Sequence, residues 1–450
     1  MTKNNSKDLT VGSPTGLILG FSLPLLLGML FQQVYSLMDT IIVGRFLSVS
    51  ALAAVGSTGS ICFLIIGFCQ GVCAGFSLPI AQRFGAKDEK GLKKYVGNAG
   101  IVSVIIAIIM TALTVLLCGH ILTWMNTPGD IYDLAYQYLI VIFAGIPATI
   151  LYNLLSGYLR SLGNSVIPVI FLIIAAVLNI GLDLLFILVF NMGVFGAAIA
   201  TVLAQVVSAL YCLVYIRRAA ELLPRKTDWR ADGVLLGALV GKGLPVAVMN
   251  SVTAVGGMVL QVFVNQMGTA YVAAYAACMK VCGLFEQPGI TLGLALLTFT
   301  GQNYGAGKYD RIKQGVRAGV VLSVLVNLPF AALEIFCPKL LASLMLNDAT
   351  VISYTCIFLP VTGVALFALG WLFVFRNACQ GMGKTVLPMV SGIVEVAMRV
   401  MVVLLLAPRL AFRGVAFAEI SAWVGAGVML MITYFFYQRR LSGKTPDVRG

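Results

Sequence analysis

Seven ionisable residues fall within apolar stretches of the sequence, where burying a charge is costly and usually serves a function. These residues are Asp39, Asp183, Lys280, Glu286, Glu395, Arg399 and Glu419. Asn179 and Asp183 are four residues apart and therefore share one helix face. Asp39 closes the first apolar stretch, and Thr201 lies near the start of the sixth. Their carboxylate, amide and hydroxyl oxygens suit a hard cation such as Na⁺, or a proton shared between carboxyl groups.

These polar groups also have a plainer interpretation, in which each makes a private hydrogen bond to a neighbouring helix. That alternative stays open for Asp39 and for the pair Asn179 and Asp183. Glu395 and Arg399 are likewise four residues apart, which predicts an intrahelical ion pair that makes their burial tolerable. A role of this ion pair in coupling is the alternative.

Prolines near these acids indicate where helices bend. Pro24 shares a predicted helix with Asp39, so a bend there would couple the state of Asp39 to the shape of a cleft. Glu286 precedes Pro288 and is expected near a kink that faces the cleft. The candidates for lining the cleft or bending a helix are Pro24, Tyr35, Lys280 and Glu286.

The composition requires a membrane around these residues. The chain has 450 residues, of which 60% are hydrophobic and 10% charged, and its mean hydropathy is +0.98. A soluble domain cannot hide so much apolar surface, so lipid must cover most of it. A membrane-spanning helix needs about 20 apolar residues. Twelve stretches qualify and are expected to be helices, centred near Leu27, Ile65, Ile108, Ala144, Ile174, Gln205, Thr253, Gly289, Leu325, Leu366, Val402 and Gly427.

The net charge of +13 follows this topology and does not indicate nucleic acid. With twelve spans that start inside, 24 of the 30 Lys and Arg fall in cytoplasmic segments and four in outer loops. Only Lys280 and Arg399 are expected within spans. This asymmetry predicts a multi-pass protein of the plasma membrane with both termini in the cytoplasm. Residues 17–38 are expected to form a retained span and not a cleaved signal peptide.

Cysteine and histidine usage argues against an enzyme. The chain has ten Cys but one His, and most Cys lie inside predicted helices as small buried hydrophobes. No nucleophile or metal constellation is evident, so we expect no catalysis and no cofactor.

The sequence repeats itself at a constant offset of 220 in residue number, as from position 82 to position 302. The segment Gln82-Arg-Phe-Gly85-Ala86 matches Gln302-Asn-Tyr-Gly305-Ala306, and Pro168 matches Pro388. Each half then holds six spans, and an even number gives both halves the same orientation in the membrane. Glu419 corresponds roughly to Thr201, which hints at the vestige of a second site.

The repeat predicts two pseudo-symmetric six-helix lobes. We expect an N-terminal lobe at residues 1–216, a cytoplasmic linker rich in Arg at 217–242, and a C-terminal lobe with a short cytoplasmic tail at 243–450. Two lobes around a central cleft can rock against each other and so expose the cleft alternately to the two sides.

Several segments resemble the multidrug and toxic compound extrusion (MATE) transporters, in order and in both halves. They are Gln33-Val-Tyr35, Met38-Asp39-Thr-Ile-Ile-Val-Gly44-Arg45, Ala51-Leu-Ala-Ala-Val-Gly56, Gln302-Asn-Tyr-Gly-Ala306 and Phe375-Arg376-Asn377-Ala-Cys-Gln-Gly381-Met-Gly383. The resemblance implies a twelve-helix antiporter that exports organic cations and drugs, driven by H⁺ or Na⁺. In the branch named for the DNA-damage-inducible protein F, it also implies a cation or proton site in the N-terminal lobe. Its residues here would be Asp39, Asn179, Asp183 and Thr201.

The sequence departs from the family in its second half. The stretch from Pro245 to Thr253 lacks the acid that sodium-binding members carry, and Cys282 stands where related sequences often have an acid. An ion site in the C-terminal lobe is therefore not expected, unless Glu286, one helical turn later, substitutes.

The function predicted is export of small cationic amphipathic substrates by a monomer. The alternative is a lipid-linked oligosaccharide flippase of the same architecture. Such a cavity should hold several Arg or Lys for a pyrophosphate, whereas only Lys280 and Arg399 are expected within spans.

Overall fold

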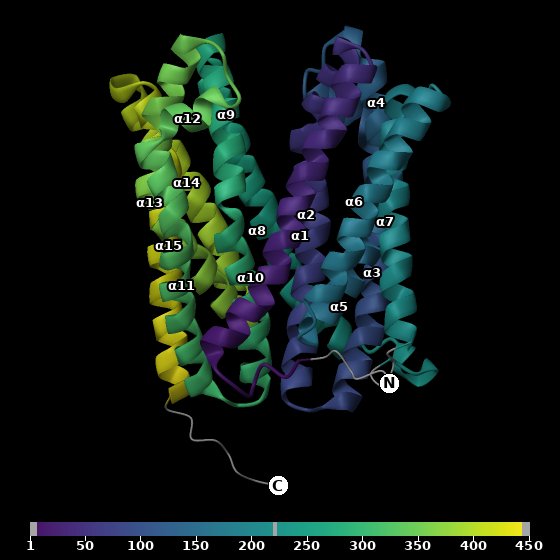
Figure 1. Cartoon of the computed structure of the whole chain (residues 1–450). Helices are drawn as coiled ribbons and strands as arrows, with labels where there is room; N and C mark the ends of the chain where they lie inside the picture. The colour runs from purple at the N-terminus through teal and green to yellow at the C-terminus, as the bar shows by residue number, and fades with distance from the viewer. Residues whose placement is uncertain (1–6, 219–222, 443–450) are drawn as a thin grey trace. The chain divides into compact units, whose positions relative to one another are not determined.

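Helices joined by short turns and loops make up the residues that the computed structural model describes, 7–218 and 223–442 (Figure 1). Residues 219–222 of the predicted linker and residues 443–450 of the predicted tail region lie outside that part. The first repeat comprises α1 (Pro14–Phe46), α2 (Val49–Gly85), α3 (Glu89–Trp124), α4 (Gly129–Ala144), α5 (Ile146–Ser161), α6 (Val166–Leu184), the π-helix η1 (Leu185–Val189) and α7 (Gly193–Arg218). The 3₁₀-helix η2 (Lys226–Trp229) follows. The second repeat comprises α8 (Gly233–Asn265), α9 (Thr269–Phe285), α10 (Gln287–Gly305), α11 (Tyr309–Phe336), α12 (Pro338–Ser343), α13 (Ala349–Gly381), α14 (Val386–Leu410) and α15 (Phe412–Ser442).

These helices confirm the predicted all-helical membrane fold. In the described residues, 11 helical segments are long and apolar enough to cross a membrane, and the pair α4 and α5, bent by 44°, brings the number to 12. The breaks between α4 and α5 and between α9 and α10 coincide with Pro147 and Pro288, each in the first turn of the following helix. Proline is tolerated there because a helix does not use its first N–H groups. The other prolines expected to bend helices lie inside continuous ones: Pro24, Pro245 and Pro360.

The sequence repeat extends to the helix boundaries. α2 begins at Val49 and α9 at Thr269, positions that differ by the offset of the repeat, and so do the starts of α3 and α11 and those of α6 and α14. The turn before α6 contains Gly163 with φ 82°, and the turn before α14 contains Gly383 with φ 75°. Glycine adopts this left-handed conformation without strain. The two halves therefore share their turn chemistry as well as their helix starts.

Contacts divide the chain into two compact units. Unit 1 consists of Met1–Asp8 and Leu27–Ala247, and unit 2 of Leu9–Leu26 and Val248–Gly450. The first part of α1 thus packs in unit 2, and the first part of α8 packs in unit 1. The exchange is reciprocal, because residues 9–26 correspond to residues 229–246 in the repeat. The sequence-based division at 1–216, 217–242 and 243–450 instead keeps residues 9–26 with the N-terminal lobe and assigns residues 229–246 to the linker and the C-terminal lobe. Sequence similarity did not show the exchange because it does not reveal packing.

The segment before α1 is held in unit 2 by the turn between α10 and α11. The Leu9 backbone N–H donates to Gln302 Oε1 at 2.8 Å, and Asn303 Nδ2 donates to the Leu9 carbonyl at 3.2 Å. Lys308 Nζ donates to the Thr10 carbonyl at 2.9 Å. Gln302 and Asn303, which belong to the second copy of the repeated motif, therefore anchor the segment just before α1.

The segment before α8 is held in unit 1 by α3. The Asp232 N–H donates to Asn98 Oδ1 at 2.9 Å, and Asn98 Nδ2 donates to the Arg230 carbonyl at 3.3 Å. The exchanged part of α8 also packs closely on α2, where a Cβ added at Gly75 would overlap the Gly243 Cα. Glycine at both positions allows this backbone approach.

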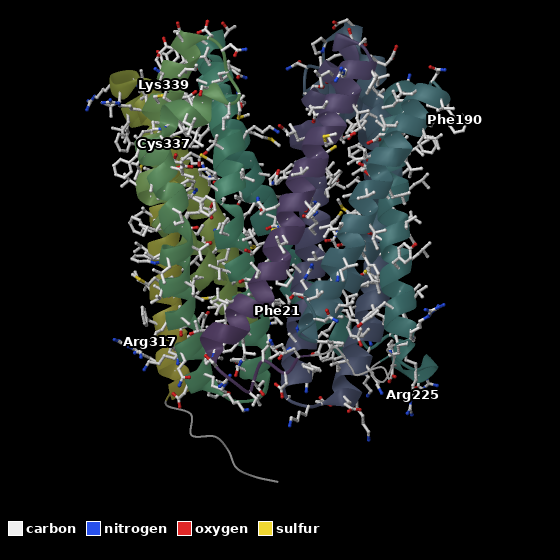
Figure 2. All side chains as sticks on the ribbon, in the orientation of Figure 1. Phe21, Phe190, Arg225, Arg317, Cys337 and Lys339 are labelled. Atoms are coloured by element: carbon white, nitrogen blue, oxygen red, sulfur yellow. The ribbon has the colours of Figure 1, made fainter. Side chains whose placement is uncertain are left out.

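Apolar side chains cover much of the outward surface, as a lipid environment requires. Leu116 of α3 is 78% exposed and Val177 of α6 is 65% exposed. Figure 2 shows Phe190 and Arg225 near opposite ends of the unit 1 helices, and Lys339 and Arg317 near opposite ends of the unit 2 helices. In each unit an Arg side chain therefore lies near the opposite end of the helices from the other labelled residue.

Replacement of Gly75 tests the packing of α8 on α2. Gly75→Ala should lower the melting temperature in detergent and cost about 1–3 kcal/mol, because its Cβ meets backbone that cannot swing aside. Gly59→Ala on the same helix is the matched control, since a Cβ there meets nothing within 4 Å. Equal melting temperatures for the two variants would contradict the close approach.

Candidate functional site

The four residues predicted to bind a cation or proton lie in unit 1, on three helices. Asp39 is on α1, Asn179 and Asp183 are on α6, and Thr201 is on α7. Asn179 is 1% exposed and Asp183 is fully buried. The π-helix η1 begins two residues after Asp183. Such π-helical turns often occur at functional sites because they disturb the regular backbone ladder.

The carboxyl groups of Asp39 and Asp183 lie within hydrogen-bonding reach of each other. Asn179 Nδ2 donates to Thr201 Oγ1 at 3.4 Å, and Thr201 Oγ1 donates to the Ala197 carbonyl at 3.1 Å. The structure therefore brings the predicted residues together as an acid pair beside an amide–hydroxyl pair.

This cluster has more acceptors than donors. Among the described residues, both Asp183 oxygens, Asp39 Oδ1 and Asn179 Oδ1 receive no hydrogen bond from a protein donor. The ion pairs of the described chain also include none with Asp39 or Asp183. Two adjacent carboxylates repel each other in a medium of low dielectric constant unless a proton or a cation lies between them. The donor set therefore fits H⁺ or Na⁺.

Two tyrosines flank the acid pair. Tyr35, one turn before Asp39, interacts electrostatically with Asp39 and Asp183. Tyr138 of α4 interacts with the same two acids and with Tyr35. Tyr138 was absent from the sequence-based candidates, and its one signal was a hydroxyl group inside an apolar stretch.

Pro24 lies on the same helix as Asp39 but in the other unit. Leu26, two residues after Pro24, is the last α1 residue of unit 2, and Asp39 belongs to unit 1. The second repeat follows the same pattern, because Ala247 comes two residues after Pro245 and is the last α8 residue of unit 1.

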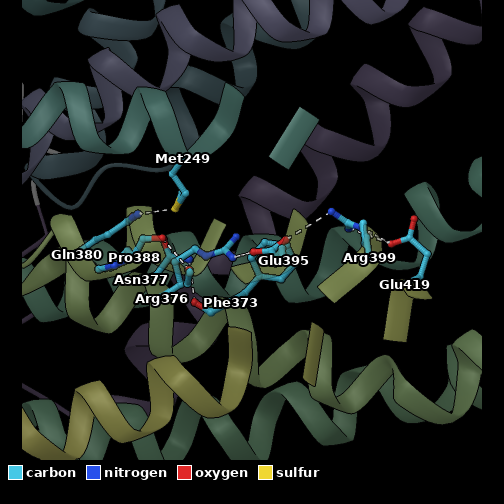
Figure 3. A network of polar contacts seen from close by, with 10 residues as sticks. Met249, Phe373, Arg376, Asn377, Gln380, Pro388, Glu395, Arg399 and Glu419 are labelled. Carbon is cyan, nitrogen blue, oxygen red and sulfur yellow. Dashed lines mark hydrogen bonds and ion pairs between the residues drawn. The ribbon is translucent and has the colours of Figure 1, made fainter. Parts of the chain in front are cut away.

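Glu395 and Arg399 belong to a longer row of charges in unit 2 (Figure 3). Arg399 Nη1 lies 3.9 Å from Glu395 Oε2, the predicted intrahelical pair. Each has a closer partner on another helix: Glu395 pairs with Arg376 of α13, and Arg399 Nη2 lies 2.9 Å from Glu419 Oε2 of α15. Tyr275 OH also donates to Glu419 at 3.4 Å. Charges of opposite sign alternate along the row, so they compensate one another.

Arg376 is a buried charge that was absent from the sequence-based candidates. It is 6% exposed inside α13, and Arg160 lies inside α5. About 20 residues cross a membrane, whereas α13 has 33, so the apolar stretch alone did not show that the helix continues through Arg376.

The remaining candidates do not join the acid pair of unit 1. Lys280 is exposed on α9. Glu286 ends α9 and interacts electrostatically with Glu419, Arg399 and other charges of the row. Glu419, considered as the vestige of a second site, instead pairs with Arg399. In the described chain, no three His, Cys, Asp or Glu side chains gather into a metal-binding group.

A sequence model of the MatE family matches residues 24–185 and again residues 245–405. The chain belongs to the MatE family. The two matched ranges are related by nearly the same offset as the sequence repeat, so both repeats are MatE units.

Curated MatE relatives match most of the chain. It is 29% identical to the probable multidrug resistance protein YoeA of Bacillus subtilis (strain 168), covering 93% of this chain and 92% of that protein. It is 30% identical to the probable multidrug resistance protein YpnP of the same organism, over 68% of each chain. It is 25% identical to the multidrug export protein MepA of Staphylococcus saprophyticus, over 83% and 84%.

Solved MatE structures share this fold. One is a MATE protein crystallised in complex with MaL6, with TM-score 0.92 and 23% identity over 99% of this chain and 100% of that one. Another is a multidrug resistance MATE family transporter in an outward-facing conformation, with the same TM-score, identity and coverage.

The alternating charges of unit 2 predict a specific pattern of stability. Arg376→Met should lower the stability by about 3–5 kcal/mol, because Glu395 keeps only its weaker contact with Arg399. The double variant Arg376→Met/Glu395→Gln should recover most of that loss. Thermal unfolding in detergent measures both. A double variant as unstable as the single one would show that lost packing, and not the unpaired charge, causes the effect.

Proposed function

We propose that the chain is a secondary active multidrug efflux antiporter, which exports organic cations and drugs in exchange for H⁺ or Na⁺. The observation that carries the proposal is the acid pair of Asp39 and Asp183, which has no basic partner among the described residues. Family membership supports ion-coupled transport, and the names of the relatives support drugs as substrates.

Coupling proceeds through the charge of the acid pair. A proton or Na⁺ from the outer side binds at Asp39 and Asp183, and Asn179 and Thr201 supply further oxygens. Occupancy removes the repulsion between the carboxylates and changes how α1 packs on α6. Because α1 continues from unit 2 into unit 1, the change reaches both units. The lobes at residues 1–216 and 243–450, joined by 217–242, then alternate in access to the two sides.

Substrate binding needs few fixed charges in this proposal. Cationic amphipathic molecules suit a lining of apolar and aromatic side chains with an acid nearby. The protein acts as a monomer in the plasma membrane. Both termini face the cytoplasm, as the distribution of Lys and Arg supports.

The buried Arg376 does not favour the flippase alternative. Binding of a pyrophosphate needs basic side chains that are not already paired with acidic ones. Arg376 and Arg399 already pair with Glu395 and Glu419. Binding of a fluorescent cationic dye, compared with binding of an isoprenoid pyrophosphate to the purified protein, distinguishes the two functions.

Neutralising Asp39 tests the site. Asp39→Asn should reduce ion-driven dye efflux to the rate of protein-free vesicles while the protein stays folded, because an amide cannot release a proton or neutralise Na⁺. Asp133→Asn, at an exposed position of α4, is the matched control and should keep full activity. Full efflux by the Asp39 variant would sink the proposal.

The choice of ion is a separate question, because the acid pair alone suits a proton whereas the added oxygens of Asn179 and Thr201 also suit Na⁺. Reconstituted vesicles with an imposed pH gradient, and then with an imposed Na⁺ gradient, measure which one drives efflux. We expect at least one gradient to do so. Efflux that responds to neither would contradict antiport.

A further inference from the structure

Glu334 of α11 is a carboxyl group that the proposed transport cycle does not use. It is fully buried near the end of the helix, inside unit 2. α13 packs tightly against it, since a Cβ added at Gly363 would lie 2.8 Å from Glu334 Cβ. Water therefore does not surround this acid, and the protein must supply its partners.

Its polar partners are both uncharged. Thr362 Oγ1 lies 3.2 Å from Glu334 Oε2, and Cys282 Sγ lies 4.0 Å from Glu334 Oε1. Among the described residues, no Lys, Arg or His nitrogen lies within 4.0 Å of Glu334. The arginines Arg376 and Arg399 of unit 2 are instead committed to Glu395 and Glu419.

The donors and acceptors around Glu334 accommodate its protonated form. The Thr362 hydroxyl has one hydrogen but two acceptors in reach, Glu334 Oε2 and the Leu359 carbonyl at 3.0 Å. If Thr362 donates to the Leu359 carbonyl, its oxygen can accept a hydrogen bond from a protonated Glu334. The Cys282 thiol lies 3.8 Å from Thr362 Oγ1 and 4.0 Å from Glu334 Oε1, so it can donate to either oxygen. Uncharged partners alone therefore satisfy a protonated Glu334, whereas an ionised Glu334 would keep its charge in an apolar span with no cation beside it.

The surrounding titratable groups do not compensate a negative charge on Glu334. α9 contributes the thiols Cys278 and Cys282, and its end contributes Glu286, which is itself an acid; all three interact electrostatically with Glu334. α13 contributes the hydroxyl of Thr362. Ionisation in this conformation would therefore add an uncompensated charge to an apolar span.

We propose that Glu334, with Thr362 and Cys282, forms a second proton-binding site that is separate from Asp39 and Asp183 and belongs to unit 2. Glu334 holds a proton while α11 and α13 pack as they do here, and it releases that proton to water when this packing opens during transport. The site takes H⁺ whichever ion drives export through unit 1.

Infrared spectroscopy of the purified, reconstituted protein tests this site. The wild type at neutral pH should show the carbonyl stretch of a protonated carboxyl group that Glu334→Gln removes. The band should persist in the double variant Asp39→Asn/Asp183→Asn, which separates this test from that of the unit 1 site. It should also lose intensity when a transported dye is added, because the site then opens for part of the cycle.

A second pair of variants keeps the test decisive if Glu334→Gln does not fold. Thr362→Val removes the hydrogen-bond acceptor and should move the band to higher frequency, whereas Thr362→Ser keeps the hydroxyl and should leave it in place. Identical carboxyl bands in the wild type and Glu334→Gln would show that Glu334 carries no proton here. Identical bands in the two Thr362 variants would show that Thr362 is not a partner of the protonated group and would overturn the proposed site. A Glu334 band that transport leaves unchanged would show a permanently protonated structural group and would also overturn the proposal.

Discussion

The hydrocarbon core of a bilayer contains no water, so the protein itself must compensate each charge that it buries there. Unit 2 does so for four of its charged side chains. Arg376, Glu395, Arg399 and Glu419 alternate in sign across α13, α14 and α15, and the row binds these helices to one another. The acid pair of unit 1 has no such compensation in the described chain. The charge row of unit 2 and the acid pair of unit 1 thus treat buried charge in opposite ways, and the lack of a basic partner is the basis for proposing that the acid pair takes a cation.

The repeats have also diverged in where their helices break. α4 and α5 meet at Pro147, whereas the corresponding part of α13 is continuous. α9 and α10 meet at Pro288, whereas the corresponding part of α2 is continuous. Each repeat therefore has one interrupted span, but at a different place. Glu286, which lies at the break in the second repeat, owes its position to this divergence, and the unit 1 repeat offers no equivalent acid.

The sequence predicted the features that depend on local spacing and composition. The twelve apolar stretches, the constant offset of the repeat and the shared face of Asn179 and Asp183 all follow from residue types counted along the chain. The roles of Arg376 and Tyr138 were not predicted. Arg376 lies near the end of α13, which is longer than a membrane span requires, and a tyrosine in an apolar stretch is too common to indicate a site. The exchange of residues 9–26 could not be predicted either, because similarity identifies corresponding residues but not their neighbours.

That exchange bears on how the protein can be divided and how it arose. A fragment cut at the repeat boundary would lack residues 229–247, which complete unit 1, and would carry residues 9–26, which unit 2 requires. Neither half-chain could fold alone into the unit seen here, although two co-expressed halves could complement each other. An ancestral protein with a single repeat would likewise have lacked the helix segment that completes its unit, and a second copy of the same protein could have supplied that segment. Reciprocal pairing of two chains would thus have preceded their fusion, and the present linker would record where the two genes were joined.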